Sequence, residues 1–266
     1  MANGKTHFIV FANEKGGTGK STTAVHTAVA LAATGYQVAA IDLDTRQRTL
    51  TRYLDNREAT ARRRSLSLPS PIHTVLGLMT PAGLDQEIAR IGSDADFIVI
   101  DTPGRDDPVS RAAIAKADTI VTPINDSFVD LDLIGQVDAE TFRVKKLSFY
   151  SELIWDLRKA RAQTDGATVD WVILRNRLQH IEANNMKRVA KALEELSKRV
   201  GFRTISGLGE RVIYRELFPK GLTLLDVEAI GGIGISHIAA RQELREMIAG
   251  LALPQRESDQ AELQFA

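Results

Sequence analysis

Residues 13–23 read NEKGGTGKSTT. The stretch follows the apolar segment HFIVFA at 7–12 and precedes an alanine-rich segment that is expected to form a helix ending at Gly35. A glycine-rich loop between a buried strand and a helix binds phosphate groups, because its backbone N–H groups and the positive end of the helix dipole point to one place. Lys20 and Ser21 close the loop with the amine and the hydroxyl that such loops offer to outer phosphate oxygens and Mg²⁺. The sequence therefore predicts a site for a nucleoside triphosphate with Mg²⁺.

The loop departs from the common pattern G-x-x-x-x-G-K-[ST] at its first position, where Glu14 replaces the glycine. A second lysine, Lys15, opens the loop and is followed directly by two glycines. The octet KGGTGKST at 15–22 resembles the deviant Walker A motif of the ParA/MinD family of ATPases. This resemblance implies that the nucleotide is ATP, that the chain is an ATP hydrolase, and that the ATP state is a homodimer.

In this family the first lysine of the loop reaches across a dimer interface to the phosphates of the partner's ATP, and the resemblance assigns that role to Lys15. Lys20 then serves the nucleotide bound by its own chain. The physical argument agrees, because Gly16 and Gly17 carry no side chains and let a second backbone approach closely. ADP lacks the γ-phosphate that the two lysines would share, so ADP is not expected to join two chains.

The composition excludes several classes of protein. The 266 residues include no cysteine, which rules out disulfides, thiolate nucleophiles, iron–sulfur clusters and cysteine-based zinc sites. The five histidines form no pair with ligand spacing, so we expect structural roles for them. The 34 basic and 34 acidic residues give no net charge, so a polyanion-binding surface has to be a local patch. The N-terminus lacks the apolar core of a signal peptide and no run of about 18 apolar residues occurs, so we expect a cytoplasmic protein.

Short continuous apolar runs recur along the chain and alternate with segments of helical pattern. Such runs are typical of strands that a parallel sheet buries on both faces. The alternation predicts a doubly wound α/β fold, with a mostly parallel sheet and helices on both of its faces. We expect one P-loop ATPase domain over residues 1–253, an irregular connection at 65–81 and a polar, disordered tail at 254–266. The predicted strands are HFIVFA (7–12), YQVAAID (36–42), FIVID (97–101), TIVTPI (119–124) and WVILR (171–175).

Aspartates end two of the predicted strands, at the edge of the sheet where the phosphate loop also lies. Asp101 ends FIVID, and a carboxylate in that place holds the water shell of Mg²⁺. The sequence DTPG that begins there supplies Gly104, whose N–H is expected to face the γ-phosphate. For Asp44 the family resemblance implies that it positions the attacking water, which leaves Asp42 for the metal shell or a structural role. The expected metal-site residues are Ser21, Asp42 and Asp101, and the expected catalytic residues are Lys15, Lys20 and Asp44.

Asn176 directly follows the strand WVILR. In the family, an asparagine after the corresponding strand recognises adenine, and the resemblance assigns this role to Asn176, although asparagines at strand ends also serve plain turns. The residues expected to contact the nucleotide are Gly16, Gly17, Thr18, Gly19, Lys20, Ser21, Thr22, Gly104 and Asn176.

The remaining sequence distinguishes the branches of the family. The nitrogenase iron protein needs cysteines, which this chain lacks. MinD-like members end in a basic membrane helix, whereas residues 237–251 carry Glu243 and Glu246 among their arginines, so we expect a helix packed on the sheet and no membrane binding. The segments DLDTRQRTLTRYLDNR (42–57) and RVIYRELFPKGLTLLD (211–226) resemble the MipZ branch, and this likeness extends over nearly the whole chain.

The resemblance to the MipZ branch implies a slow ATPase that acts as a dimerisation switch and positions the division site. It implies non-specific binding to DNA, association with ParB and inhibition of FtsZ assembly, with a nucleoid-associated distribution enriched near the poles or the chromosome origin. Two alternatives stay open: a ParA-type ATPase that segregates DNA, and a small-molecule kinase or ligase built on the same loop. Sedimentation of FtsZ polymers distinguishes the first of these, and Lys15 disfavours the second.

Residues 187–215 contain eight basic and three acidic side chains, a local excess of positive charge. On a helix, Lys187, Lys191 and Lys198 lie on one face, and apolar residues with core spacing lie on another. A basic stripe of this kind contacts phosphates without reading bases. A second basic cluster at 57–64 could contact DNA or a partner, but we interpret it as a solvated helix end beside a loop. The expected DNA-binding residues are Lys187, Arg188, Lys191, Lys198, Arg199 and Arg203.

Overall fold

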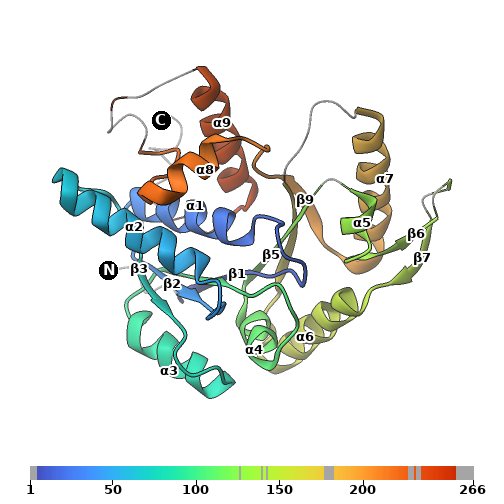
Figure 1. Cartoon of the computed structure of the whole chain (residues 1–266). Helices are drawn as coiled ribbons and strands as arrows, with labels where there is room; N and C mark the ends of the chain where they lie inside the picture. The colour runs from blue at the N-terminus through green and yellow to red at the C-terminus, as the bar shows by residue number, and fades with distance from the viewer. Residues whose placement is uncertain are drawn as a thin grey trace.

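The computed structural model describes residues 5–125, 127–138, 140–141, 143–176, 183–226, 231 and 235–255. Within these residues, seven parallel strands form one sheet in the order β3-β2-β4-β1-β5-β8-β9, and β6 and β7 form a separate antiparallel pair. Figure 1 shows helices on both sides of the large sheet. The predicted doubly wound α/β fold is confirmed.

The large sheet consists of β3 (Ile72–Val75), β2 (Val38–Asp42), β4 (Phe97–Asp101), β1 (His7–Phe11), β5 (Thr119–Asn125), β8 (Asp170–Asn176) and β9 (Arg203–Ser206). The antiparallel pair is β6 (Gly135–Val137) and β7 (Val144–Leu147). The helices are α1 (Lys20–Ala33), α2 (Thr49–Arg64), α3 (Pro81–Ile91), α4 (Pro108–Lys116), α5 (Phe128–Leu131), α6 (Phe149–Asp165), α7 (Ala183–Val200), α8 (Ile213–Leu217), the 3-10 helix η1 (Phe218–Lys220) and α9 (Ile235–Gly250).

The five predicted strands are confirmed as β1, β2, β4, β5 and β8, and α1 ends just before Gly35, whose φ of 86° is left-handed. The expected irregular connection is wrong in one respect, because it contains β3. This strand lies at the edge of the sheet and Ile72 is 62% exposed, so β3 lacks the continuous apolar run of a central strand. β9 forms the opposite edge and was missed for the same reason.

Two apolar cores, one on each face of the sheet, hold the helices in place. On one face α1, α2 and α9 pack through residues such as Val25, Leu54 and Leu244. On the other face α4, α6 and α7 pack through residues such as Ile154 and Leu193. The expected packing of the last helix on the sheet is therefore confirmed, as is the apolar spacing predicted for α7.

None of the helices among the described residues has the length and the apolar character that crossing a bilayer requires. The tail expected at 254–266 lies outside the described residues from 256 onward.

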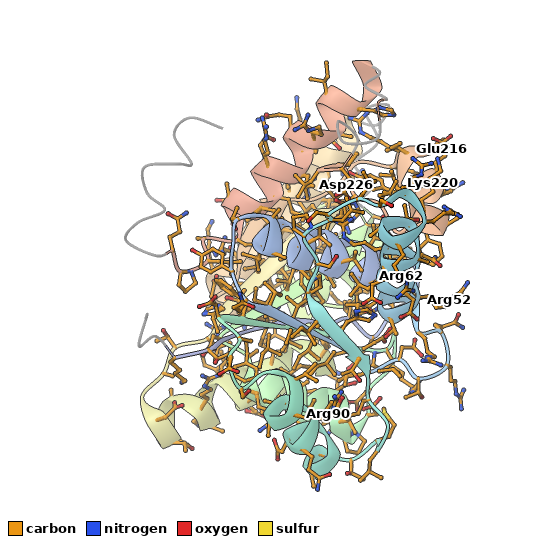
Figure 2. All side chains as sticks on the ribbon, turned by 90° about the vertical axis from the view of Figure 1, so that its left-hand side faces the viewer. Arg52, Arg62, Arg90, Glu216, Lys220 and Asp226 are labelled. Atoms are coloured by element: carbon orange, nitrogen blue, oxygen red, sulfur yellow. The ribbon has the colours of Figure 1, made fainter. Side chains whose placement is uncertain are left out.

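The basic cluster at 57–64 contains one residue that is not solvated. Arg57 is fully buried, and its guanidinium donates to Asp226 Oδ1 at 2.8 Å and to the carbonyl oxygen of Pro69 at 2.8 Å. Figure 2 shows Asp226 within the molecule, whereas Arg52, Arg62 and Lys220 extend outward. The interpretation of the whole cluster as a solvated helix end is therefore wrong for Arg57, whose partner Asp226 is 169 residues away in the chain.

This ion pair joins α2 to the segment that follows η1. Burial alone would raise the pKa of Asp226, but the hydrogen bonds from Arg57 and from Thr223 outweigh burial and hold that pKa below its ordinary value. Both charges are thus compensated where they lie, and removal of one of them leaves the other buried without a partner.

Arg57→Ala is expected to lower the free energy of unfolding by about 3–5 kcal/mol, because Asp226 then stays buried as an uncompensated charge. Arg62→Ala is the matched control on the same helix. The Arg62 side chain is 76% exposed and lies 3.8 Å from Glu58, so its loss should change stability by less than about 0.5 kcal/mol. Urea unfolding measures both values, and equal effects of the two substitutions would contradict the structural role of Arg57.

Candidate nucleotide site

The loop between β1 and α1 has the backbone geometry of an anion-binding nest. Gly17 and Gly19 have φ values of 76° and 89°, in the left-handed region that favours glycine. Lys20 is the first residue of α1, so the positive end of the helix dipole points at the loop. The buried hydroxyl oxygen of Thr18 has no hydrogen-bond partner among the described residues. The loop therefore offers backbone N–H groups and a free polar atom to a phosphate.

Lys20 lies inside the site. It is 7% exposed, and its amine donates to the carbonyl oxygen of Lys15 at 2.8 Å. Burial lowers the pKa of the Lys20 amine, and the carboxylates of Asp101 and Asp44 oppose that shift. Burial makes a neighbouring negative charge worth more to the Lys20 ammonium group than it would be in water, and a triphosphate would supply such charge.

Lys15 lies at the surface of the same loop. Its side chain is 33% exposed, and the amine donates to the carbonyl oxygen of Val129 and lies 3.4 Å from Asp130 Oδ1. These acceptors belong to α5, on the outer side of the loop. In Figure 1 the blue loop between β1 and α1 extends toward α5. The two lysines of the motif therefore point to different places: Lys20 into the site and Lys15 onto a neighbouring surface helix.

Asp101 is the carboxylate at the centre of the site. The register of β2 and β4 places it beside Asp42, and both side chains are buried. Burial and the neighbouring charge of Asp42 raise the pKa of Asp101 to about 8, against hydrogen bonding by Ser21 and the charge of Lys20. Asp101 Oδ1 has no hydrogen-bond partner within the described part of the chain.

These features fit Mg²⁺. A buried, unpartnered carboxylate oxygen beside a hydroxyl is an arrangement of hard oxygen ligands, which Mg²⁺ prefers. The described residues hold no group of three His, Asp or Glu side chains that would ligate a metal by themselves. Mg²⁺ commonly takes its other ligands from water and substrate phosphates, so Asp101 with Ser21 is a sufficient protein contribution.

Asp42 and Asp44 organise the segment after β2. Asp42 Oδ1 accepts from the N–H of Asp44 at 2.9 Å, and its Oδ2 accepts from the N–H of Thr51 at 3.0 Å. Asp44 is half-buried and accepts from the N–H of Gln47 at 3.0 Å. The hydrogen bonds give Asp42 a structural position, whereas Asp44 faces the charge of Lys20 with part of its carboxylate accessible.

Gly104 lies directly against the loop. A Cβ at this position would be 3.1 Å from the backbone nitrogen of Gly16, so any larger residue would push the DTPG turn and the loop apart by a few tenths of an ångström. Thr22 and Ser21 occupy the first turn of α1. The structure thus brings the sequence-predicted nucleotide and metal residues to one edge of the sheet.

Asn176 lies beside the loop, and both its amide nitrogen and its amide oxygen form hydrogen bonds within the protein. Its amide nitrogen donates to the carbonyl oxygen of Thr18 at 2.9 Å, and its Oδ1 accepts from the N–H of Leu208 at 2.9 Å. Next to it is a cavity of about 330 Å³ between α1 and the segment 208–211, also lined by Tyr53 and Tyr214. This cavity is the space that a nucleoside attached to phosphates in the loop would enter.

Sequence reasoning missed two supports of the loop. Asn13 donates to the carbonyl oxygen of Pro123, 110 residues away, and its Oδ1 accepts from the N–H of Lys15 at 2.6 Å. Tyr150 on α6 donates from its hydroxyl to the carbonyl oxygen of Ala12 at 2.8 Å. The asparagine next to the motif was a detectable signal, but nothing local marks the tyrosine as a partner of the loop.

The expected DNA-binding residues divide into two groups. Lys187, Arg188, Lys191, Lys198 and Arg199 are exposed on α7, opposite the buried apolar side of that helix. Lys198 also pairs with Glu195 at 2.8 Å and with Glu194 at 3.2 Å.

Arg203 lies apart from this group, on β9. Its guanidinium binds Asp170 at 2.7 Å and donates to the carbonyl oxygen of Leu251 at 2.7 Å. These contacts fasten β8 and the end of α9 to β9.

The geometry of a phosphate-binding loop at the carboxyl edge of a parallel sheet places the chain among the P-loop nucleotide-binding proteins. Three comparisons describe its relatives. The family model for ATPase MipZ matches residues 7–255. The septum site-determining protein MinD of Helicobacter pylori is 29% identical over 188 residues, which cover 60% of this chain and 70% of that protein.

The protein ParA of Rhizobium radiobacter is 29% identical over 128 residues, 48% of this chain and 53% of that protein. The solved structure of apo McdA from Cyanothece has a TM-score of 0.63 at 17% identity and covers 91% of this chain and 99% of that chain. The chain belongs to the MipZ family. It is an ATP hydrolase of the ParA/MinD class, whose members are involved in partition or in placement of the division site.

Asp101→Asn is expected to raise the thermal midpoint of the protein without nucleotide and to remove the extra stabilisation that Mg²⁺ adds to ATP. The pKa of Asp101, about 8, lies above the ordinary value of about 3.9, so the folded state binds this proton more tightly than the unfolded chain. Stability from this group is therefore complete at acid pH and falls as the pH rises toward 8. Asparagine is neutral at every pH, so the Asp101→Asn variant does not lose this stability as the pH rises.

Thermal unfolding between pH 5 and pH 8.5, with and without Mg²⁺ and ATP, measures both effects. Asp132→Asn, at an exposed position, is the control and should follow the parent. The assignment fails if Asp101→Asn keeps both the pH profile and the Mg²⁺-dependent gain of the parent protein.

Proposed function

We propose that this ATPase is an ATP-dependent dimerisation switch, in which each chain contributes Lys15 to the nucleotide of the other. The observation that carries the proposal is the difference between the two lysines of one loop. Lys20 is 7% exposed and faces its own site, whereas the Lys15 side chain is 33% exposed and faces α5. A surface cation next to a nucleotide site is available to a second chain that docks there.

Hydrolysis in this proposal depends on position and charge, as phosphoryl transfer generally does. The loop N–H groups and Lys20 would hold the phosphates, and Ser21 with Asp101 would hold Mg²⁺. Mg²⁺, when bound, neutralises charge that develops on the phosphate oxygens. Asp44 orients the attacking water beside them. Slow turnover suits a switch, because its ATP state has to persist long enough to diffuse.

The contact of Lys15 within its own chain does not oppose this role strongly. The Lys15 side chain is 33% exposed and that of Asp130 is 13% exposed, so water screens this ion pair only in part. Asp130 also accepts from the N–H of Asn125 at 3.2 Å, a contact that stays when Lys15 leaves. A triphosphate in the facing chain carries several negative charges and is a better partner. Binding of ATP therefore favours the exchange of Lys15 from Asp130 to the second chain.

The dimer is proposed to bind DNA without sequence preference, to associate with ParB and to inhibit FtsZ assembly near the poles. Family membership supports these partners, and the exposed basic face of α7 supports the DNA contact. Two such faces in one dimer would double the phosphate contacts and therefore the dependence of affinity on salt. Release of γ-phosphate would then dissolve the dimer and its DNA contact together.

Lys15→Ala is expected to stay monomeric in ATP, because the facing nucleotide loses the cation from its partner. Asp44→Ala is expected to form a dimer that persists, because nucleotide and Lys15 remain while the water is no longer oriented. Size-exclusion chromatography with light scattering, in ATP and in ADP, separates the two outcomes. A dimer of Lys15→Ala in ATP, or a monomer of Asp44→Ala, would contradict the proposed roles.

Reversal of three charges on α7, Lys187→Glu with Lys191→Glu and Arg199→Glu, is expected to abolish binding to duplex DNA in ATP without changing the oligomeric state. The matched control reverses Arg62, Arg63 and Arg64 at the end of α2, a basic cluster of equal charge. Fluorescence anisotropy at several salt concentrations gives the affinity and the salt slope. If the α7 variant still binds DNA and the α2 variant does not, the DNA surface lies elsewhere than on α7.

A further inference from the structure

The outer wall of the nucleoside cavity is a segment without regular structure. Residues 207–211 lie in the connection between β9 and α8, and Leu208, Gly209 and Arg211 line the cavity together with the first turn of α1. A segment of this kind has many conformations, and fixing its backbone costs roughly 1–2 kcal/mol per residue at 25 °C. Its shape therefore has to be imposed by contacts from other parts of the chain.

Two side chains impose that shape from opposite ends. Asn176 binds the N–H of Leu208, as described above, and Glu243 binds the next part of the segment. Glu243 Oε2 accepts from the N–H of Gly209 at 3.1 Å and from Nε of Arg211 at 3.1 Å. Its other oxygen accepts from the second guanidinium nitrogen of Arg211. One carboxylate thus holds both the backbone and a side chain of the cavity wall.

The carboxylate is held on a rigid support. Glu243 lies in α9, and its neighbours Ala240, Leu244 and Met247 are buried in the core beside α1. The Glu243 side chain is 25% exposed and that of Arg211 is 26% exposed, so the pair is partly shielded from water. The Glu243 carboxylate accepts hydrogen bonds from the Arg211 guanidinium and so raises the pKa of that guanidinium. A fixed helix therefore determines where the cavity wall lies.

We propose that Glu243 is a positioning residue for the nucleoside part of ATP: it holds segment 207–211 in the shape that receives the base and ribose. This inference rests on nucleotide binding at the loop and adds a function for α9. The phosphates are held by the loop and Lys20, whereas the nucleoside contacts a wall that α9 fixes. A wall that is ordered before binding spares the ligand the entropic cost of ordering it.

Two ligands distinguish a positioning role of Glu243 from a general effect of the substitution on stability. ATP uses the phosphate loop and the nucleoside cavity, whereas inorganic tripolyphosphate with Mg²⁺ uses the phosphate loop alone. Glu243→Ala should weaken ATP binding at least about tenfold, the effect of losing a charge-assisted contact. Tripolyphosphate affinity should stay within about twofold, because Glu243 holds the cavity wall at Gly209 and Arg211, whereas the loop at 13–23 holds the phosphates. Damage to the whole fold would weaken both ligands.

Isothermal titration of the full chain, held monomeric by Lys15→Ala, gives both affinities for each variant. Glu243→Gln keeps an acceptor for the N–H of Gly209 but loses the charge, so it should fall between the parent and Glu243→Ala. Glu246→Ala removes the same charge from an exposed position on the same helix and should bind both ligands as the parent does. Thermal unfolding of each variant verifies that the fold is retained.

The inference is overturned if Glu243→Ala binds ATP within about twofold of the parent, or if ATP and tripolyphosphate weaken in parallel in both Glu243 variants. A parent chain that binds tripolyphosphate and ATP equally would also overturn it, because the cavity would then receive no nucleoside. A parent that binds neither ligand would instead refute nucleotide binding at the loop, so the two failures are distinguishable.

Discussion

The site depends on the burial of like charges at the carboxyl edge of a parallel sheet. The register of β2 with β4 places Asp42 beside Asp101, and the loop after β1 places the Lys20 amine against them. Taking these groups out of water raises the pKa of Asp101 and lowers that of Lys20, so both charged forms are less favourable than in solution. Mg²⁺ would satisfy the carboxylate and phosphate would satisfy the amine. Binding of a nucleotide with its metal would therefore offset the energetic cost of burying these charges at the edge of the sheet.

The other lysine of the loop, Lys15, points away from the site that Lys20 faces. Lys15 is separated from Lys20 by four residues, yet its amine lies against Val129 and Asp130 on a surface helix. A cation that is near a nucleotide but directed outward is useful to another chain.

Sequence reasoning recovered the features that local patterns encode. The apolar runs located β1, β2, β4, β5 and β8, because strands buried on both faces have no polar alternation. The glycine loop and Asp101 followed from motifs that combine a strand end with a phosphate-binding turn. The edge strands β3 and β9 were missed, because one exposed face removes the apolar run.

Charges could be counted from the sequence but not paired. Arg57, Arg203 and Glu243 have partners 169, 33 and 34 residues away, and no periodicity connects them. Arg203 was therefore predicted to bind DNA, whereas in the structure its guanidinium binds Asp170 and the carbonyl oxygen of Leu251 at the end of α9. The cavity wall at 207–211 was missed for the same reason, since β8, α1 and α9 meet there only after folding.

The most direct test of the central claim is a mixing experiment between two inactive variants. Lys20→Ala cannot hold its own nucleotide but retains Lys15, and Lys15→Ala holds ATP but offers no cation to a partner. In a mixed dimer the Lys15→Ala chain keeps its ATP and receives Lys15 from the other chain. Steady-state hydrolysis should therefore reappear on mixing, although each variant alone is inactive. If the mixture stays inactive at every ratio, or if Lys15→Ala alone hydrolyses ATP like the parent, Lys15 does not act across the interface.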